Sequence, residues 1–352
     1  MFIVGIGTAN PAYRYTQADC LEALTKSNRF GKLKPGSQLL LKRILQSAHG
    51  IETRNLALAD LSHAFDLFPD ALHRRFRETA PALAAEAAQN ALQEAGLHAC
   101  DIDAVVISTC TGYLCPGLTS YVMEQMGLRQ DVLALDLVGQ GCGAAIPNLR
   151  TAEALLAADR AQHVLSICVE VCSAALYLDD DPGVLVSACL FGDGAGAAVL
   201  SKIPRGTHPN VEWIGSETFT NPQDRDLLRF EQKDGMLRNI LSPQVPALAA
   251  QYAQRVLSKM LERKGLAQSD ISGWIWHGGG KNVLDALQEQ LALSDSDVQS
   301  SRAILNAHGN MSSAFVYFVL KAALANKPRA GWWWLSAFGA GFSCHGALLK
   351  VA

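Results

Sequence analysis

The sequence predicts a mixed α/β protein made of two duplicated halves. Three observations support this prediction: apolar strands alternate with helical segments, the chain matches itself in two places, and 49% of its 352 residues are hydrophobic. A chain of this length exceeds one average domain and can bury a large core. Only 18% of the residues are charged, so we expect no disordered tail or linker.

The repeat begins at Pro81 and again at Pro246. The segment PALAAEAAQNALQEAGLHACDIDAVVIS reads as a helix, a glycine, an aspartate and a strand, and PALAAQYAQRVLSKMLERKGLAQSDISGWIWH repeats that order. Both helical segments carry one apolar stripe at helical spacing. The register continues further along the chain, where the Gly-Cys pair that ends at Cys142 corresponds to the Gly-Asn pair that ends at Asn310. Two packed α/β repeats are therefore expected.

The expected strands are continuous apolar runs such as VVIS, HVLSIC and WWWLSA. Runs of this kind are typical of sheets that are covered by helices on both faces. We expect an N-terminal half over residues 1–205, which carries Cys142, and a C-terminal half over residues 206–352, which carries His277 and Asn310.

Charge and cysteine content exclude several functional classes. The net charge of −3, with Lys and Arg scattered, argues against binding to nucleic acid or to an anionic membrane, so a small-molecule partner is expected. No apolar run approaches membrane-spanning length, and the opening MFIVGIGTANP is too short for a signal peptide. The nine cysteines form no CxxC pair, which favours free thiols and a reducing cytoplasm.

Cys142 is the strongest candidate nucleophile. In DLVGQGCGAAIPNLRTAEALL an apolar strand ends in Gly-Gln-Gly-Cys-Gly and a helix begins. Backbone N–H groups and the positive end of the helix dipole favour a thiolate at such a position, and flanking glycines let a substrate carbonyl approach the backbone. The alternative is a small buried cysteine without a chemical role, which is common for free cysteines.

His277 and Asn310 are the candidate partners of this thiol. His277 ends the strand GWIWH and is followed by three glycines, and Asn310 occupies the repeat position that matches Cys142. Two-fold packing of the halves would bring both helix starts to one centre. Taken singly, a histidine at a strand end is more often structural, and an asparagine at a helix start is an ordinary cap.

Together the three residues suit thioester chemistry. A cysteine can hold an acyl group, while imidazole and carboxamide donors stabilise the negative charge on a second thioester's carbonyl oxygen. His277 could also hold the Cys142 thiolate as an ion pair. Neither role needs a metal, and the glycine clusters fit no dinucleotide or phosphate-loop pattern, so no cofactor is expected.

Four motifs resemble the chalcone-synthase-like type III polyketide synthases over essentially the whole chain: GQGCGAA around Cys142, LFGDGAGA around Phe191, WHGGGKNVLDAL around His277 and GNMSS around Asn310. The resemblance implies a thiolase-like fold with two packed mixed sheets in α-β-α-β-α layers, and a homodimer. It implies that Cys142 carries the starter and growing chain, and that His277 and Asn310 bind the malonyl-CoA thioester during decarboxylation and condensation.

The same resemblance implies a set of binding residues. Phe191 matches the aromatic gatekeeper between a CoA tunnel and the cavity, Arg238 falls at the second gatekeeper position, and Lys42 with Arg43 retain part of a basic CoA-docking segment. Flanking lysine positions read Leu40 and Ser47, so delivery by acyl-carrier protein instead of acyl-CoA stays open. The remaining substrate-contact positions, whose small side chains suggest a roomy apolar cavity, are Cys110, Cys115, Cys172, Ala175 and Ser312.

Three alternatives stay open from the sequence. An initiating ketoacyl-ACP synthase uses the same three residues for one condensation, and the loop Phe338-Gly339-Ala340-Gly341 leans toward that class, whereas Phe191 and GNMSS favour a polyketide synthase. A papain-like cysteine hydrolase has the same order of Cys, His and Asn, but the duplicated halves argue against it. A non-catalytic partner of a condensing enzyme would be expected to lack one of the three residues.

Overall fold

The computed structural model describes residues 1–47, 50–205 and 209–352. Its largest sheet has nine strands in the order β11-β12-β13-β8-β1-β7-β6-β4-β5. Their bounds are β1 Phe2–Ala9, β4 Ala104–Ser108, β5 Leu133–Leu137, β6 His163–Glu170, β7 Gly194–Ser201, β8 Val211–Thr220, β11 Ile271–Trp276, β12 Gly331–Gly339 and β13 Ser343–Val351. Two smaller sheets pair β2 (Arg14–Thr16) with β3 (Thr53–Asn55), and β9 (Leu228–Lys233) with β10 (Met236–Leu241).

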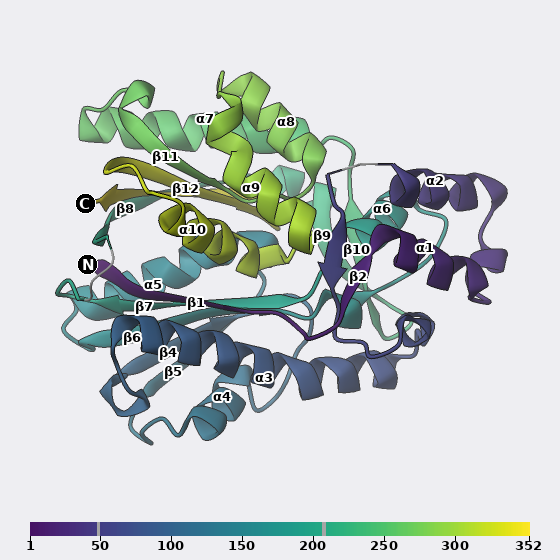
Figure 1. The fold of residues 1–352 in the computed structure, drawn as a ribbon, viewed down its shortest axis with the longest axis horizontal. Coiled ribbons are helices and arrows are strands. Elements are labelled where there is room, and N and C mark those ends of the chain that lie inside the picture. The colour runs from purple at the N-terminus through teal and green to yellow at the C-terminus, as the bar shows by residue number, and fades with distance from the viewer. Residues whose placement is uncertain (48–49, 206–208) are drawn as a thin grey trace.

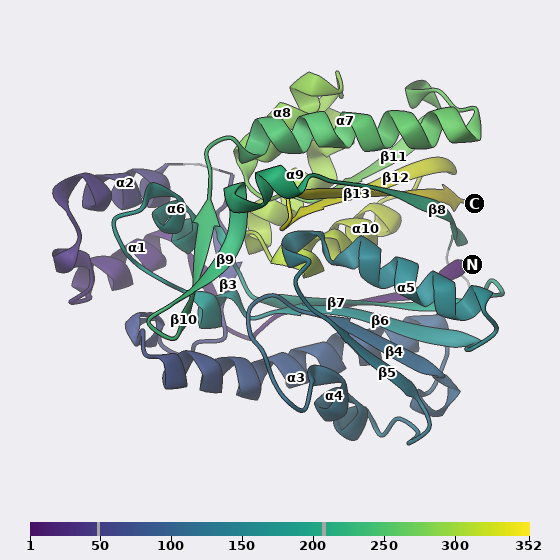
Figure 2. The ribbon, with the colours of Figure 1, turned by 180° about the vertical axis from the view of Figure 1, so that it is seen from behind.

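The large sheet consists of two parts that meet only where β1 and β8 pair. Phe2 is opposite Glu212 and Ile3 is opposite Val211. Beyond this short contact the strands diverge, so that the β1-β7-β6-β4-β5 part and the β11-β12-β13-β8 part face each other (Figures 1 and 2). The predicted pair of packed sheets is therefore present, and the two sheets are joined along one edge by main-chain pairing.

Helices fill three layers around these two parts (Figure 1). The central helices α5 (Ala145–Ala157) and α10 (Phe315–Ala325) contact strands of both parts. The outer helices over the first part are α3 (Pro69–Ala95) and α4 (Leu118–Met126). Those over the second part are α7 (Val245–Lys264), α8 (Lys281–Gln290) and α9 (Asp295–His308). The α-β-α-β-α layering expected from the sequence is confirmed.

The duplication is visible as a repeated order of elements. In the first half α3 leads through a single helical turn to β4, and in the second half α7 leads through a similar turn to β11. Further on, α5, β6 and β7 correspond to α10, β12 and β13. The predicted boundary after residue 205 adjoins residues 206–208, which lie outside the described residues, so that division stays a prediction.

Small residues let α3 lie close to the centre of the sheet. The alanine stripe of α3, which includes Ala87 and Ala91, is fully buried against β1. A Cβ atom added at Gly7 of β1 would lie 1.9 Å from the carbonyl oxygen of Ala87, and one at Gly5 would lie 2.2 Å from that of Ala91. Since only glycine fits at such a distance, the β1 sequence FIVGIGTA fixes how near the helix comes.

A third group of elements packs against one end of the layers, at the right of Figure 1. It contains α1 (Gln17–Lys26), α2 (Pro35–Gln46), α6 (Pro182–Leu190), the small sheets and a buried apolar cluster of their own. Short 3-10 turns complete the chain: Phe30–Lys32, Leu61–Phe65, Ala99–Asp101, Gly141–Gly143, Cys172–Ala175, Pro222–Leu227, Gln268–Asp270 and Ser312–Ala314. Within the described residues, none of the helices combines the length and apolar character that a bilayer span requires.

Candidate active site

Cys142 lies where the sequence predicts it, in a tight turn between β5 and α5. The turn spans Gly141–Gly143, and Gly141 has a φ of +57°, which favours glycine. The loop after β12 packs directly on this turn: a Cβ atom added at Gly141 would lie 3.1 Å from the Ala340 backbone nitrogen, and one at Gly143 would lie 3.0 Å from that of Gly339. The FGAG segment of the second half therefore supports the nucleophile of the first.

His277 and Asn310 come from the second half. His277 directly follows β11, where its backbone N–H donates to the Ser336 carbonyl at 2.9 Å. Asn310 directly follows the loop after α9, and its Nδ2 donates to the Gly279 carbonyl at 3.2 Å. A Cβ atom added at Gly279 would lie 3.7 Å from His277 Nε2, so the imidazole and the carboxamide both lie next to this glycine.

Ser312 connects these groups to the thiol. Its hydroxyl donates to Cys142 Sγ at 3.2 Å, and its backbone N–H donates to Asn310 Oδ1 at 2.9 Å. Ser312 has a φ of +50°, an unfavourable conformation for a side chain with a Cβ atom, and such strain is typical of functional sites. Cys142, His277 and Asn310 also line one cavity, which we call the outer cavity and which Arg43, Phe191 and Phe338 line as well.

A second cavity, the inner cavity, lies on the other side of Phe191. Cys142 and Phe191 line both cavities. Four more of the predicted substrate-contact residues line the inner cavity: Cys110, Cys172, Ala175 and Ser312. The rest of its wall is mostly apolar and comes from α1, α2, α6 and the segment around residues 56–65. Phe191 thus lies between the outer cavity and the mostly apolar inner cavity, and its role as a gatekeeper stays a prediction.

Three predicted binding residues lie elsewhere in the described chain. Lys42 is not among the residues that line either cavity, and its Nζ lies 5.5 Å from the centre of the Phe30 ring. Cys115 is exposed in the loop before α4 and also lines neither cavity. Arg238 lies on β10 with its guanidinium on Asp179 and Glu231, outside both linings. Their predicted roles in binding therefore stay predictions, and the structure shows that their side chains lie outside the linings of both cavities.

Burial controls the charge states in this site. It raises the pKa of the Cys142 thiol to about 12 and lowers the pKa of the His277 imidazole to about 4. Loss of hydration therefore opposes the thiolate that the helix start was expected to favour. Burial by itself favours a neutral thiol beside a neutral imidazole over the ion pair expected from the sequence, so thiolate formation needs a nearby group that takes the proton.

Glu170 is a part of the site that the sequence patterns did not single out. It is fully buried at the end of β6 and accepts hydrogen bonds from the Cys110 backbone N–H at 3.0 Å and the Thr111 hydroxyl at 3.0 Å. The Ser312 hydroxyl lies 3.2 Å from it. Burial raises the pKa of this carboxyl. The signal in the sequence was an acidic residue that ends the otherwise apolar strand HVLSICVE.

No metal centre is indicated by the described residues. Across residues 1–47, 50–205 and 209–352, no group of three or more His, Cys, Asp and Glu side chains is placed to hold a metal ion. The polar groups around Cys142 instead form the hydrogen-bonded chain of Ser312, Asn310 and Glu170. Such an arrangement can hold a thioester and polarise its carbonyl oxygen.

Two family models together match most of the chain. One, described as FAE1/Type III polyketide synthase-like protein, matches residues 9–210. The other, the C-terminal domain of chalcone and stilbene synthases, matches residues 219–352. The chain belongs to the type III polyketide synthase family. The resemblance stated from the four sequence motifs is confirmed.

Curated relatives and solved structures agree with this family. The 1,3,6,8-tetrahydroxynaphthalene synthase of Streptomyces peucetius subsp. caesius is 32% identical, over 99% of this chain and 92% of its own length. The 3,5-dihydroxyphenylacetyl-CoA synthase of Streptomyces toyocaensis is 31% identical, over 90% and 80%. The C-terminal type III polyketide synthase domain of Steely1 from Dictyostelium superposes with a TM-score of 0.91 at 25% identity, over 99% of both chains. PKS-I from the brown alga Ectocarpus siliculosus gives 0.88 at 27%, over 99% and 98%.

This type III polyketide synthase is accordingly an acyltransferase of the thiolase-like fold that condenses malonyl-CoA with an acyl starter. Neither the two Streptomyces enzymes nor the two structural neighbours are named as initiating ketoacyl-ACP synthases or as cysteine hydrolases. The ketoacyl-ACP synthase and cysteine hydrolase alternatives therefore lack support, and the two Streptomyces relatives are named as enzymes and not as non-catalytic partners.

Proposed function

We propose that Cys142 carries the acyl chain and that His277 and Asn310 bind the malonyl thioester. The starter transfers from its thioester to Cys142 Sγ, and the free thiol of the donor leaves. Malonyl-CoA then loses CO2 to give an enolate, whose carbon attacks the acyl carbonyl, and Cys142 leaves as thiolate. His277 and Asn310 line the outer cavity beside Cys142, where N–H groups can stabilise the enolate oxygen.

The inner cavity favours an aliphatic starter. Leucines from several elements line it, including Leu24 of α1, Leu41 and Leu45 of α2, and Leu58. Its polar lining groups include Ser312 and Cys110 near the thiol and Arg54, Ser187 and Asn239 elsewhere, but most of the lining residues are apolar. An alkyl chain attached to Cys142 would bury its methylene groups against these leucines, and each buried methylene stabilises binding by about 0.8 kcal/mol.

We propose that the acyl starter, like the malonyl group, is delivered as its CoA thioester. Arg43 lines the outer cavity and can face the phosphates of CoA. Lys281 also lines this cavity, although it pairs with Asp285 at 2.6 Å. Delivery by an acyl-carrier protein stays the alternative, and a comparison of CoA-bound with carrier-bound acyl groups separates the two.

The assembly that we propose is a homodimer formed through β5. This strand is at the edge of the sheet, and its outer residues, including Leu133, are exposed. Tyr113 and Val138 lie beside it and are 70% and 60% exposed. A second copy would satisfy the open edge and cover these apolar side chains.

The nine cysteines are all free, which supports a reducing, cytoplasmic location.

Intact-mass spectrometry tests the central assignment. Incubation of the wild type with a saturated acyl-CoA should add one acyl mass, and malonyl-CoA should then be consumed with release of CO2 and formation of a longer product. Cys142→Ala should show no acyl adduct and no product. Cys172→Ala, which alters another thiol in the inner cavity, should keep the adduct. An acyl adduct that persists in Cys142→Ala would overturn the assignment, and reaction only with carrier-bound acyl groups would overturn CoA delivery.

A further inference from the structure

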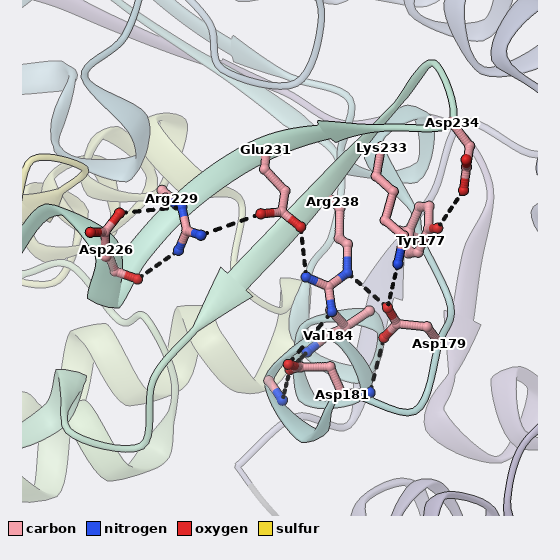
Figure 3. Close-up of polar contacts among 11 residues, drawn as sticks. Tyr177, Asp179, Asp181, Val184, Asp226, Arg229, Glu231, Lys233, Asp234 and Arg238 are labelled. Atoms are coloured by element: carbon pink, nitrogen blue, oxygen red, sulfur yellow. Dashed lines mark hydrogen bonds and ion pairs between the residues drawn. The ribbon is translucent and has the colours of Figure 1, made fainter.

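We infer that Arg238 is a positioning residue that ties the β9–β10 hairpin to the start of α6 and thereby sets the width of the acyl chamber. This inference rests on the proposed use of the inner cavity for the starter chain. Arg238 is on β10, and its partners come from the opposite strand of the hairpin and from residues 179–181, which precede α6 (Figure 3).

The hairpin has one face on the cavity and one face on this polar cluster. Phe230 pairs across the hairpin with Asn239, and both line the inner cavity. The next pair along, Glu231 with Arg238, must point to the other face, because successive side chains of a strand alternate. Arg238 is therefore next in sequence to Asn239, which lines the inner cavity, but does not line that cavity itself.

Arg238 binds three carboxylates at once. Its Nε lies 2.8 Å from Asp179 Oδ2, its Nη1 lies 2.8 Å from Glu231 Oε1, and its Nη2 lies 3.5 Å from Asp181 Oδ2. Its side chain is only 12% exposed, so these contacts are screened less than ordinary surface pairs. Figure 3 shows the guanidinium between the hairpin and the loop before α6.

The acidic residues connect Arg238 to α6. Asp181 caps that helix, since its Oδ1 accepts the backbone N–H groups of Gly183 at 2.8 Å and Val184 at 3.2 Å. Asp179 Oδ1 in turn accepts the Asp181 backbone N–H at 2.9 Å. A displacement of the hairpin would thus pull on the helix start.

Helix α6 separates the two cavities. Val184 and Ser187 line the inner cavity, and Gly183 and Val186 line the outer one. The hairpin rests against the same helix, where the Ser187 hydroxyl donates to Asn239 Oδ1 at 3.1 Å. The distance between the hairpin and α6 therefore sets the width of the inner cavity. Arg238, which lies outside this cavity, holds that distance through its ion pairs.

Loss of Arg238 would remove the cation that lies between the carboxylate of Glu231 and those of Asp179 and Asp181. Lys233 lies 3.8 Å from Asp179, and Arg229 lies 3.3 Å from Glu231, so each of these carboxylates keeps one cation. Lys233 is on β9 and would keep one longer contact between the hairpin and Asp179, but neither cation contacts Asp181. In Arg238→Met the hairpin and the α6 start would separate, which widens the chamber and favours longer starters.

The test compares Arg238→Met with Arg229→Met, an arginine on the same hairpin that pairs with Asp226 and Glu231 and not with the residues before α6. For each variant, kcat/KM is measured with saturated acyl-CoA starters of increasing length, along with KM for malonyl-CoA. We expect Arg238→Met to raise the long-to-short ratio of kcat/KM about tenfold, a change of about 1.4 kcal/mol. The KM for malonyl-CoA and the profile of Arg229→Met should stay as in the wild type.

Arg238→Lys and Asp179→Asn keep the test informative if Arg238→Met folds poorly. Lysine is a point charge that cannot bridge three carboxylates, so Arg238→Lys should shift the ratio in the same direction by a smaller factor. An unchanged starter profile in all three variants, with only a lower melting temperature, would overturn the inference. A wild type without an acyl adduct on Cys142 would instead overturn the proposed function.

Discussion

At the scale of single residues, the site is decided by how buried groups share protons and hydrogen bonds. Loss of hydration raises the pKa of the partly buried Cys142 thiol and lowers that of the buried His277 imidazole, so each favours its neutral form, and both line one cavity. Ser312 donates to the thiol, and Asn310 is held by Ser312 and Gly279. The nucleophile therefore depends on its neighbours, since thiolate is the reactive form of cysteine.

The pH profile of alkylation tests this dependence. Burial raises the pKa of the Cys142 thiol to about 12 and lowers that of the His277 imidazole to about 4, so the thiol passes its proton to His277 only if attraction within the resulting ion pair offsets the loss of hydration. Removal of the imidazole in His277→Gln should move iodoacetamide alkylation of Cys142 to higher pH, with a rate at neutral pH about tenfold lower for each unit of pKa increase. Mass spectrometry of the Cys142 peptide measures the rate. Superimposable profiles for the two proteins would show that His277 does not support the thiolate.

At the scale of elements, glycines determine which segments approach closely. Gly7 lets α3 lie on β1, and Gly141 lets the loop after β12 lie on the nucleophile turn. Neither contact is between side chains, so the apolar pattern that predicts the elements does not encode it. Close backbone approach needs glycine at one position, and the partner can be far along the chain.

A substitution at Gly7 should show the cost of losing this approach. In Gly7→Ala the new Cβ atom would lie 1.9 Å from the Ala87 carbonyl, so β1 and α3 must separate. We expect the free energy of unfolding to fall by about 3 kcal/mol, as in overpacked cores. The control Gly31→Ala has no atom within 4 Å of its new Cβ and should change it by less than about 0.5 kcal/mol. Urea titration monitored by circular dichroism measures the free energy of unfolding of both variants. Equal values for Gly7→Ala and Gly31→Ala would contradict the packing argument.

At the scale of the whole molecule, the two halves bring residues from distant parts of the chain to one centre. Cys142 comes from the first half, and His277 and Asn310 come from the second. The proposed dimer depends on the other end of the sheet, where β5 is an edge strand. Its main-chain groups and exposed apolar side chains are available for pairing with a second copy.

Charge on this edge should prevent the proposed dimer. The double variant Leu133→Lys/Val138→Lys places two cations where the apolar side chains are exposed. Light scattering after size exclusion should show the mass falling from twice the chain mass to 37.8 kDa. Ile203→Lys, which charges another exposed apolar residue, should keep the larger mass. A wild type that already elutes at the chain mass would refute the dimer.

The sequence by itself determined the duplicated α/β layers, the turn that holds Cys142, and the family, because helix and strand periods and short motifs are local patterns. It also singled out Asn310 through the repeat and His277 as the end of a strand, and the structure places both on the cavity that Cys142 lines. Only the tertiary structure decided where side chains point. Arg238 points away from the cavity and pairs with Asp179, and Lys42 lies over the Phe30 ring. Glu170 contacts Ser312 and so belongs to the site. Those outcomes depend on strand alternation and on contacts between segments far apart in sequence, which no local pattern records.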